Sequence, residues 1–174
     1  MVDLRGQYEK IKHEVDSSIQ EVIDSTAFIK GFAVGQFQES LEKYLDVRHV
    51  IPCANGTDAL QVSMMALGLK PGDEVITASF TFIATAEVIA LLGLTPVFAD
   101  VDPGTFNIVH EDIERRITKK TRAIIPVHLF GQSADMDKIM QIAKKHDLYV
   151  IEDNCQAIGA DCFFKDGTSK KAGT

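Results

Sequence analysis

The first part of the chain shows the apolar spacing of two amphipathic helices. Across residues 8–23, apolar side chains recur every three or four positions with charged residues between them; they are Tyr8, Ile11, Val15, Ile19, Val22 and Ile23. Gly31 and Gly35 are expected to interrupt this helix. A second short helix follows, and the apolar residues of its face are Phe37, Leu41 and Tyr44. We therefore predict an N-terminal helical arm over residues 1–48.

From residue 50 onward, short apolar runs alternate with helical stretches. The runs predicted as strands are residues 50–51, 74–77, 96–98, 122–125 and 148–151. The last four are far enough apart to hold a helix and two loops between them, as parallel strands require. They hardly alternate with polar residues, which is typical of strands covered on both faces. Helical stripes lie between them at Leu60, Met64 and Leu67 and at Met136, Ile139, Met140 and Ala143. The pattern predicts a three-layer α/β fold with a mostly parallel sheet over residues 49–174.

Composition narrows the classes of partner. The chain has 174 residues, with 18 Lys and Arg against 25 Asp and Glu and a net charge of −7. This excess of acid argues against a general nucleic-acid binder, which needs a basic face. No apolar run reaches the ~18 residues of a membrane helix, and the charged N-terminus lacks the apolar region of a signal peptide. The three cysteines form no C-x-x-C pair and the histidines no ligand pair, so no metal site is predicted. We expect a cytoplasmic protein with reduced thiols and neither a membrane nor a nucleic-acid partner.

The segment 53–60 lies between a predicted strand and a predicted helix. Gly56 permits a tight turn and a close approach of the backbone. Thr57 supplies a hydroxyl where the free N–H groups of a helix begin, and such a place suits a phosphate. The same residues fit equally well a plain Asn-Gly turn whose helix is capped by Thr57 or Asp58.

Other candidates for chemistry follow predicted strands, at the edge where α/β sheets bind ligands. Glu152 and Asp153 follow the last apolar run, where a carboxylate can bind a metal or a cationic ring nitrogen. Alternatively, both acids cap the next element or pair with a basic residue. Phe80 and Phe82 offer a flat face to a planar ligand, although one of the two is expected in the core. His128 is expected to be a hydrogen-bonded structural histidine.

Five motifs, taken in order, resemble the sugar-nucleotide aminotransferases of the DegT/DnrJ/EryC1/StrS group. They are N-G-T-D-A-L at 55–60, G-D-E-V-I-T-x-S-F-T-F-I-A-T-A at 72–86, T-P-V-F-x-D-V-D-P-x-T-F-N-I at 95–108, I-I-P-V-H-L-F-G-Q-x-A-D-M-D at 124–137 and V-I-E-D-x-x-Q-A at 150–157. Their shared order is far more specific than any one motif.

The resemblance implies the large domain of the fold-type-I aminotransferases, with pyridoxal phosphate (PLP) as cofactor. Gly56 and Thr57 match the family's phosphate-binding turn. Phe82 matches the aromatic residue that stacks on the cofactor ring, and Gln156 matches the residue that hydrogen-bonds its phenolic oxygen. Asp153 matches the catalytic carboxylate that pairs with the ring nitrogen. The family reaction moves an amino group from glutamate to a keto sugar carried by a nucleoside diphosphate, and the enzymes are homodimers.

One feature of the family finds no match in this sequence. The Schiff-base lysine is expected beyond residue 174, because Lys165, Lys170 and Lys171 precede the strand that carries it. The small C-terminal domain has no counterpart either, so we expect the N-terminal half of such an enzyme. Two alternatives stay open: a dehydratase of the same family, with histidine in place of the lysine, and a non-catalytic chain if the protein ends at Thr174.

Overall fold

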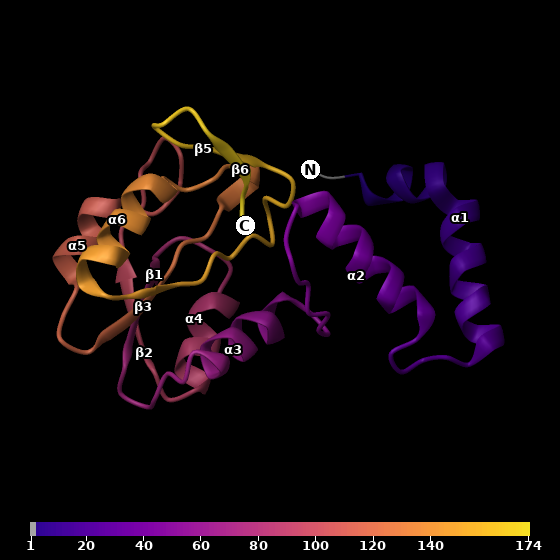
Figure 1. The fold of residues 1–174 in the computed structure, drawn as a ribbon, viewed down its shortest axis with the longest axis horizontal. Coiled ribbons are helices and arrows are strands. Elements are labelled where there is room, and N and C mark those ends of the chain that lie inside the picture. Colours follow the sequence, from indigo (N-terminus) through magenta and orange to yellow (C-terminus); the bar gives the residue numbers. More distant parts are fainter. Residues whose placement is uncertain (1–2) are drawn as a thin grey trace. The chain divides into compact units, whose positions relative to one another are not determined.

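The computed structural model describes residues 3–174, which divide into two compact units (Figure 1). The first unit ends at Pro52, and the second runs from Cys53 to Thr174. The boundary proposed from the sequence, after residue 48, lies shortly before this division.

The N-terminal unit consists of α1 (Leu4–Ser25) and α2 (Phe32–Leu45), which confirms both predicted helices. The carboxylate of Asp3 accepts a hydrogen bond from the Gly6 N–H at 2.9 Å and so caps the start of α1. Gly31 precedes α2 as its N-cap, as expected of a residue between two helices. The expectation that Gly35 interrupts the helix is wrong, since it lies inside α2. A helix of this length tolerates one interior glycine at a cost of about 1 kcal/mol relative to alanine.

The second unit is built on a four-stranded sheet. Its strands are β1 (Glu74–Ala78), β2 (Thr95–Ala99), β3 (Thr121–Ile125) and β4 (Tyr149–Val150), in the order β2-β1-β3-β4, and all neighbours are parallel. Four of the five predicted strands are therefore confirmed. The strand predicted at residues 50–51 is wrong. The Val50 N–H, which a sheet would use, donates instead to Glu42 Oε1 at 3.0 Å.

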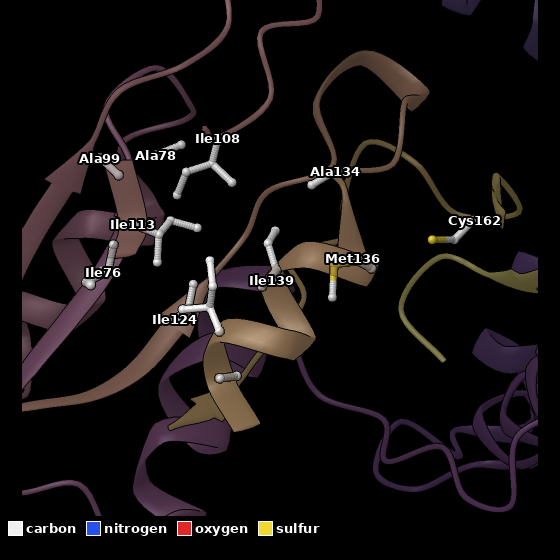
Figure 2. Close-up of a cluster of buried hydrophobic side chains, with 12 residues drawn as sticks. Ile76, Ala78, Ala99, Ile108, Ile113, Ile124, Ala134, Met136, Ile139 and Cys162 are labelled. Atoms are coloured by element: carbon white, nitrogen blue, oxygen red, sulfur yellow. The ribbon is translucent and has the colours of Figure 1, made fainter. Parts of the chain in front are cut away.

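Helices cover both faces of this sheet, which confirms the three-layer α/β fold. On one face α3 (Gly56–Ala66) and α4 (Ala84–Leu91) pack on the side chains of Val75 and Ile125. On the other face α5 (His110–Arg116) and α6 (Met136–His146) pack on Ile76 and Ile124 (Figure 2). Neighbouring residues of one strand thus enter opposite cores, as the alternation of side chains along a strand requires.

Two short elements complete the unit. A turn of 3-10 helix, η1 (Leu129–Gly131), follows β3. An antiparallel hairpin of β5 (Asp161–Phe163) and β6 (Ser169–Lys171) follows β4, and the sequence patterns above do not predict it. Within residues 3–174, no helix is both long enough and apolar enough to cross a membrane.

Asp112 ties α5 to the end of β2. Its buried carboxylate accepts hydrogen bonds from the Asp100 N–H at 2.7 Å, from Arg116 Nε at 2.6 Å and from Arg115 Nη2 at 3.0 Å. The Asp100 N–H, followed by Arg116, holds the pKa of this carboxyl below its usual 3.8. The contact therefore stabilises the fold only while Asp112 is ionised.

We expect Asp112→Asn to lower the free energy of unfolding by about 1–3 kcal/mol at neutral pH, because charge-assisted hydrogen bonds are lost. A carboxyl whose folded pKa is depressed adds stability above its unfolded pKa and loses that contribution as the pH falls through the folded pKa. The difference between the wild type and the variant should therefore narrow below about pH 4. Urea unfolding at pH 7, 5 and 3.5 measures this, with Glu87→Gln on the exposed side of α4 as control. If the difference in unfolding free energy between the wild type and Asp112→Asn is the same at all three pH values, the ionised carboxylate does not have this role.

Candidate functional site

The start of α3 presents free backbone N–H groups. The Asn55 side chain caps the helix, since its Oδ1 accepts a hydrogen bond from the Asp58 N–H at 2.9 Å. The expectation that Thr57 or Asp58 provides the cap is therefore wrong. Gly56 and Thr57 are already the first two residues of the helix, where N–H groups have no acceptor within the helix. These groups and the positive end of the helix dipole suit an anion.

Gly56 lies directly against the segment that follows β4. A Cβ atom at this position would lie 2.6 Å from Cys155 Sγ, closer than real Cβ contacts allow. Desolvation, followed by the neighbouring Asp153 carboxylate, raises the pKa of the Cys155 thiol to about 11. The thiol therefore stays protonated. The lack of a side chain at residue 56 lets the start of α3 approach Cys155 without displacing its sulfur.

Asp153 extends the line of β4 and is held there by its backbone. Its N–H donates to Pro126 O at 2.9 Å, and its carbonyl accepts from the His128 N–H at 3.0 Å. The side chain is 8% exposed, and its Oδ2 accepts a hydrogen bond from the Thr85 hydroxyl at 2.9 Å. The Cys155 N–H donates to Oδ1 at 3.3 Å. Among residues 3–174 this carboxylate has no ion-pair partner, so a buried acid is left able to bind a cation from outside the chain.

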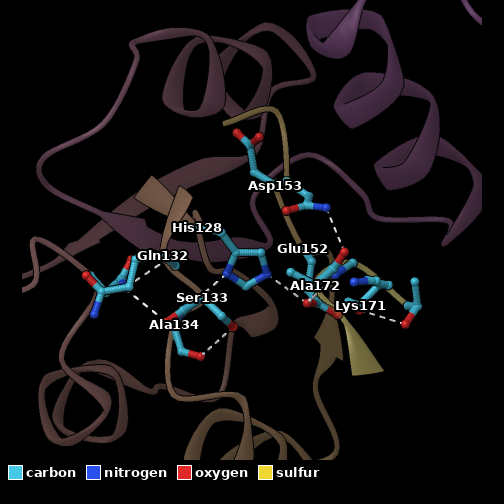
Figure 3. A network of polar contacts seen from close by, with 12 residues as sticks. His128, Gln132, Ser133, Ala134, Glu152, Asp153, Lys171 and Ala172 are labelled. Atoms are coloured by element: carbon cyan, nitrogen blue, oxygen red, sulfur yellow. Dashed lines mark hydrogen bonds and ion pairs between the residues drawn. The ribbon is translucent and has the colours of Figure 1, made fainter. Parts of the chain in front are cut away.

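Glu152 points to the opposite side of the strand from Asp153 and has a structural role (Figure 3). Fully buried His128 accepts a hydrogen bond at Nδ1 from the Ala134 N–H at 3.1 Å, so its proton is on Nε2. Nε2 donates to Glu152 Oε2 at 2.7 Å, and the Gly173 N–H donates to the same oxygen at 3.0 Å. The prediction that His128 is a hydrogen-bonded structural histidine is confirmed.

The amide of Gln156 is oriented by the backbone. Its Oε1 accepts a hydrogen bond from the Phe130 N–H at 3.1 Å, which leaves the Nε2 donors for another acceptor. Phe130 has φ 55°, a left-handed conformation that is uncommon for a bulky residue and that collects at functional sites.

The aromatic residues near this edge are exposed. Phe82 is 68% exposed and Phe80 is 50% exposed, so the expectation that one of them is in the core is wrong. Phe80 packs on Phe106, with ring centroids 5.6 Å apart, and Phe106 packs on Phe130 at 6.0 Å. After these exposed rings, the buried residues at the start of α4 include the small side chains of Ala84 and Ala86.

Contacts connect most of the residues predicted for the site. Gly56 lies against Cys155, which precedes Gln156 in the sequence and whose N–H donates to Asp153. Phe82 lies one turn before Thr85, whose hydroxyl reaches Asp153. The sequence analysis did not single out Thr85. Within residues 3–174 the Thr57 side chain makes no hydrogen bond to the others, and Thr57 shares only the first turn of α3 with Gly56.

The two cavities described in this unit, of about 740 and 310 Å³, are lined by other residues. A cavity of about 740 Å³ lies beside α5 and α6 and is lined by residues such as Asn107, Gln132 and Asp161. Within residues 3–174, no group of three or more His, Cys, Asp or Glu side chains is arranged to hold a metal ion. The groups of this region fit PLP instead: N–H groups at the start of α3 suit its phosphate, a buried carboxylate suits its ring nitrogen, and Phe82 offers an exposed ring.

Comparison with known proteins agrees with this chemistry. The sequence model of the DegT/DnrJ/EryC1/StrS aminotransferase family matches residues 9–174. A "pleiotropic regulatory protein" of Geobacillus stearothermophilus is 51% identical over 92% of this chain and 43% of its own length. A UDP-2-acetamido-2-deoxy-3-oxo-D-glucuronate aminotransferase of Pseudomonas aeruginosa is 48% identical over 91% of this chain and 44% of its own length. The chain thus spans less than half the length of these relatives.

Solved structures share the fold. An aminotransferase of the same family from Brucella abortus superposes with a TM-score of 0.86 at 44% identity, over 91% of this chain and 44% of its own. This match confirms the large-domain architecture. The GDP-4-keto-6-deoxy-D-mannose-3-dehydratase of E. coli, solved with bound hydrated PLP, superposes with a TM-score of 0.78 at 30% identity. That match covers 86% of this chain and 40% of the dehydratase.

We expect Glu152→Ala to lower the free energy of unfolding by about 1–3 kcal/mol, because the buried His128 Nε2–H loses its acceptor. Glu152→Gln, which can present an amide oxygen to His128, should lose less. Urea unfolding at pH 7 measures both variants. Equal stability of Glu152→Ala and the wild type would show that the His128 contact adds nothing to the fold.

We expect Gly56→Ala to destabilise the protein by about 1–3 kcal/mol, because the new methyl group overlaps Cys155 Sγ. Gly35→Ala is the matched control, since a Cβ at Gly35 meets nothing within 4 Å and the helix gains from alanine. The double variant Gly56→Ala/Cys155→Ala removes the overlapping sulfur. Thermal unfolding of the four proteins of this double-mutant cycle should show a smaller loss for Gly56→Ala when Cys155 is absent. A loss that is independent of Cys155 would contradict the close contact.

Proposed function

Because this chain belongs to the DegT/DnrJ/EryC1/StrS aminotransferase family, we propose that it forms the cofactor-binding part of a PLP-dependent sugar-nucleotide aminotransferase. The observation that carries the proposal is Asp153, a buried carboxylate without an ion-pair partner among the described residues, at the carboxyl end of a parallel sheet. A buried acid of this kind needs a cationic partner, and a protonated ring nitrogen is one.

PLP, when bound, supplies an electron sink that stabilises the negative charge left when a proton leaves the substrate carbon. In this proposal Asp153 is the catalytic residue that keeps the ring nitrogen protonated by accepting its N–H. The Asp153 carboxylate accepts hydrogen bonds from the Thr85 hydroxyl and the Cys155 N–H, and the Cys155 thiol interacts with it as well, which leaves part of its roughly four lone-pair positions unused. The remaining positions serve the ring nitrogen.

The other predicted residues would bind and orient the same cofactor. The N–H groups of Gly56 and Thr57, with the Thr57 hydroxyl, would bind its phosphate. Phe82 stacks on no other aromatic ring within residues 3–174. Its exposed side chain would cover one face of the cofactor ring. Gln156 would donate from Nε2 to the phenolic oxygen, because the Phe130 N–H already occupies its Oε1.

The substrate class follows from the relatives. The Pseudomonas aeruginosa relative is named for an aminotransferase that acts on a UDP-linked 3-oxo sugar acid. We therefore propose a nucleotide-linked keto sugar as amino acceptor and glutamate as donor, in a cytoplasmic homodimer that serves amino-sugar biosynthesis. The second candidate is a dehydratase of the same family. The match to the E. coli dehydratase supports it, but that enzyme is 30% identical, whereas the Pseudomonas aeruginosa aminotransferase is 48% identical.

We expect the protein to bind PLP and Asp153→Asn to weaken that binding about tenfold or more, because an amide cannot hold the ring-nitrogen proton as a carboxylate does. Absorbance titration with PLP, followed by addition of glutamate, measures binding and the shift of the cofactor band. Asp161→Asn, on the exposed hairpin, is the control. If Asp153→Asn binds PLP and responds to glutamate like the wild type, the proposed function is wrong.

The two candidate reactions differ in their sugar product. Incubation of a full-length enzyme, which also supplies the residue expected beyond Thr174 at the Schiff-base position, with PLP, glutamate and a UDP-linked 3-keto sugar should give a nitrogen-containing sugar, detected by mass spectrometry. A dehydrated sugar that contains no new nitrogen would favour the dehydratase.

A further inference from the structure

Thr85 lies at the beginning of α4, and none of the roles assigned above involves it. Its side chain is 1% exposed, and its hydroxyl donates to Asp153 Oδ2 at 2.9 Å. The two residues are 68 positions apart in the sequence, so the contact joins α4 to the end of β4.

We propose that Thr85 is a positioning residue for the cofactor-binding carboxylate. It fixes the rotation of the Asp153 carboxylate so that the oxygen lone pairs not used within the chain point to the ring nitrogen. This inference rests on the proposed function, because it concerns how the same site holds PLP.

The carboxylate needs such a restraint, because rotation of an aspartate carboxylate about its last bond is only weakly restricted. The Cys155 N–H contacts the other oxygen, but its distance of 3.3 Å is at the long end for a hydrogen bond. The Thr85 contact at 2.9 Å is the shorter of the two and comes from a different element. The Cys155 thiol interacts with the carboxylate as well, but it belongs to the same segment as Asp153, so Thr85 is the donor that restrains the carboxylate from another element.

The hydroxyl is not required for packing. Around Thr85, the buried face of α4 consists of Ala84, Ala86, Val88 and Ile89. A valine has nearly the shape of threonine and would fill this apolar layer. A threonine hydroxyl inside a helix can bond to the carbonyl three or four residues earlier, but here it donates across to Asp153. The polar atom therefore serves the carboxylate.

Thr77 provides a matched comparison within the same unit. It is also fully buried, and its hydroxyl donates to the Ile125 carbonyl at 2.9 Å. Removing either hydroxyl takes one buried hydrogen bond from the fold, but only Thr85 contacts Asp153.

The test compares Thr85→Val, Thr85→Ser and Thr77→Val. Absorbance titration measures the dissociation constant for PLP, and a pH titration of the bound cofactor follows the ionisation of its ring system. We expect Thr85→Val to bind PLP about tenfold more weakly, because Asp153 loses one well-placed hydrogen bond that restrains it. The ring should also lose its proton at lower pH, because the acceptor is no longer aligned. Thr85→Ser should match the wild type, and Thr77→Val should bind PLP normally despite a lower melting temperature.

Two results would overturn the inference. One is a Thr85→Val protein with the PLP affinity and pH titration of the wild type. The other is an equal change in Thr77→Val, which would make the effect a general loss of stability. If Thr85→Val does not fold, Thr85→Ala and Thr85→Ser provide the same comparison. The proposed function is contradicted if the wild type does not bind PLP or if Asp153→Asn binds it normally. If Asp153→Asn loses PLP binding while Thr85→Val keeps it, only the role of Thr85 is contradicted.

Discussion

The alternation of side chains along a parallel strand is the constraint on which this structure depends. Val75 and Ile76 enter different cores on the two faces of the sheet, and the same alternation continues past the end of β4. Glu152 therefore falls on the side of His128, and Asp153 falls on the side of α4. One carboxylate becomes part of the framework, and its neighbour is the one that we propose binds the cofactor.

The helices that cover the sheet bring the remaining groups to the same edge. In a parallel sheet each helix after a strand begins near the carboxyl ends of the strands. The first turn of α4, which follows β1, accordingly places Thr85 against Asp153, and Gly56, the first residue of α3, lies against Cys155 although no strand precedes that helix within residues 3–174. The site is thus assembled from segments far apart in the sequence by the geometry of repeated strand–helix units.

Much of this could be predicted from sequence, for identifiable reasons. Strands β1 to β4 appear as continuous apolar runs. The position of Asp153 after one of them leaves its role open, and the resemblance to the family makes it a predicted site residue. The strand predicted at residues 50–51 does not form, because the apolar run is too short and the Val50 N–H donates to the Glu42 side chain. The β5–β6 hairpin has strands of three residues without an apolar pattern, and only the Asp166-Gly167 turn marks it. The contact of Thr85 with Asp153 depends on which face of the sheet α4 covers, and local spacing does not contain that information.

The backbone of Asp153 is bonded on both sides to the segment after β3, whereas the ring of Phe82 stands free in solvent at the start of α4. These two parts of the site should differ in how readily they open. Amide hydrogen exchange is slowest where buried backbone bonds must all break together, and it is fast where few contacts hold a segment. We therefore expect the backbone amides around Asp153 to exchange slowly and those around Phe82 to exchange faster, so the proposed partner of the ring nitrogen is held more firmly than the proposed aromatic cover.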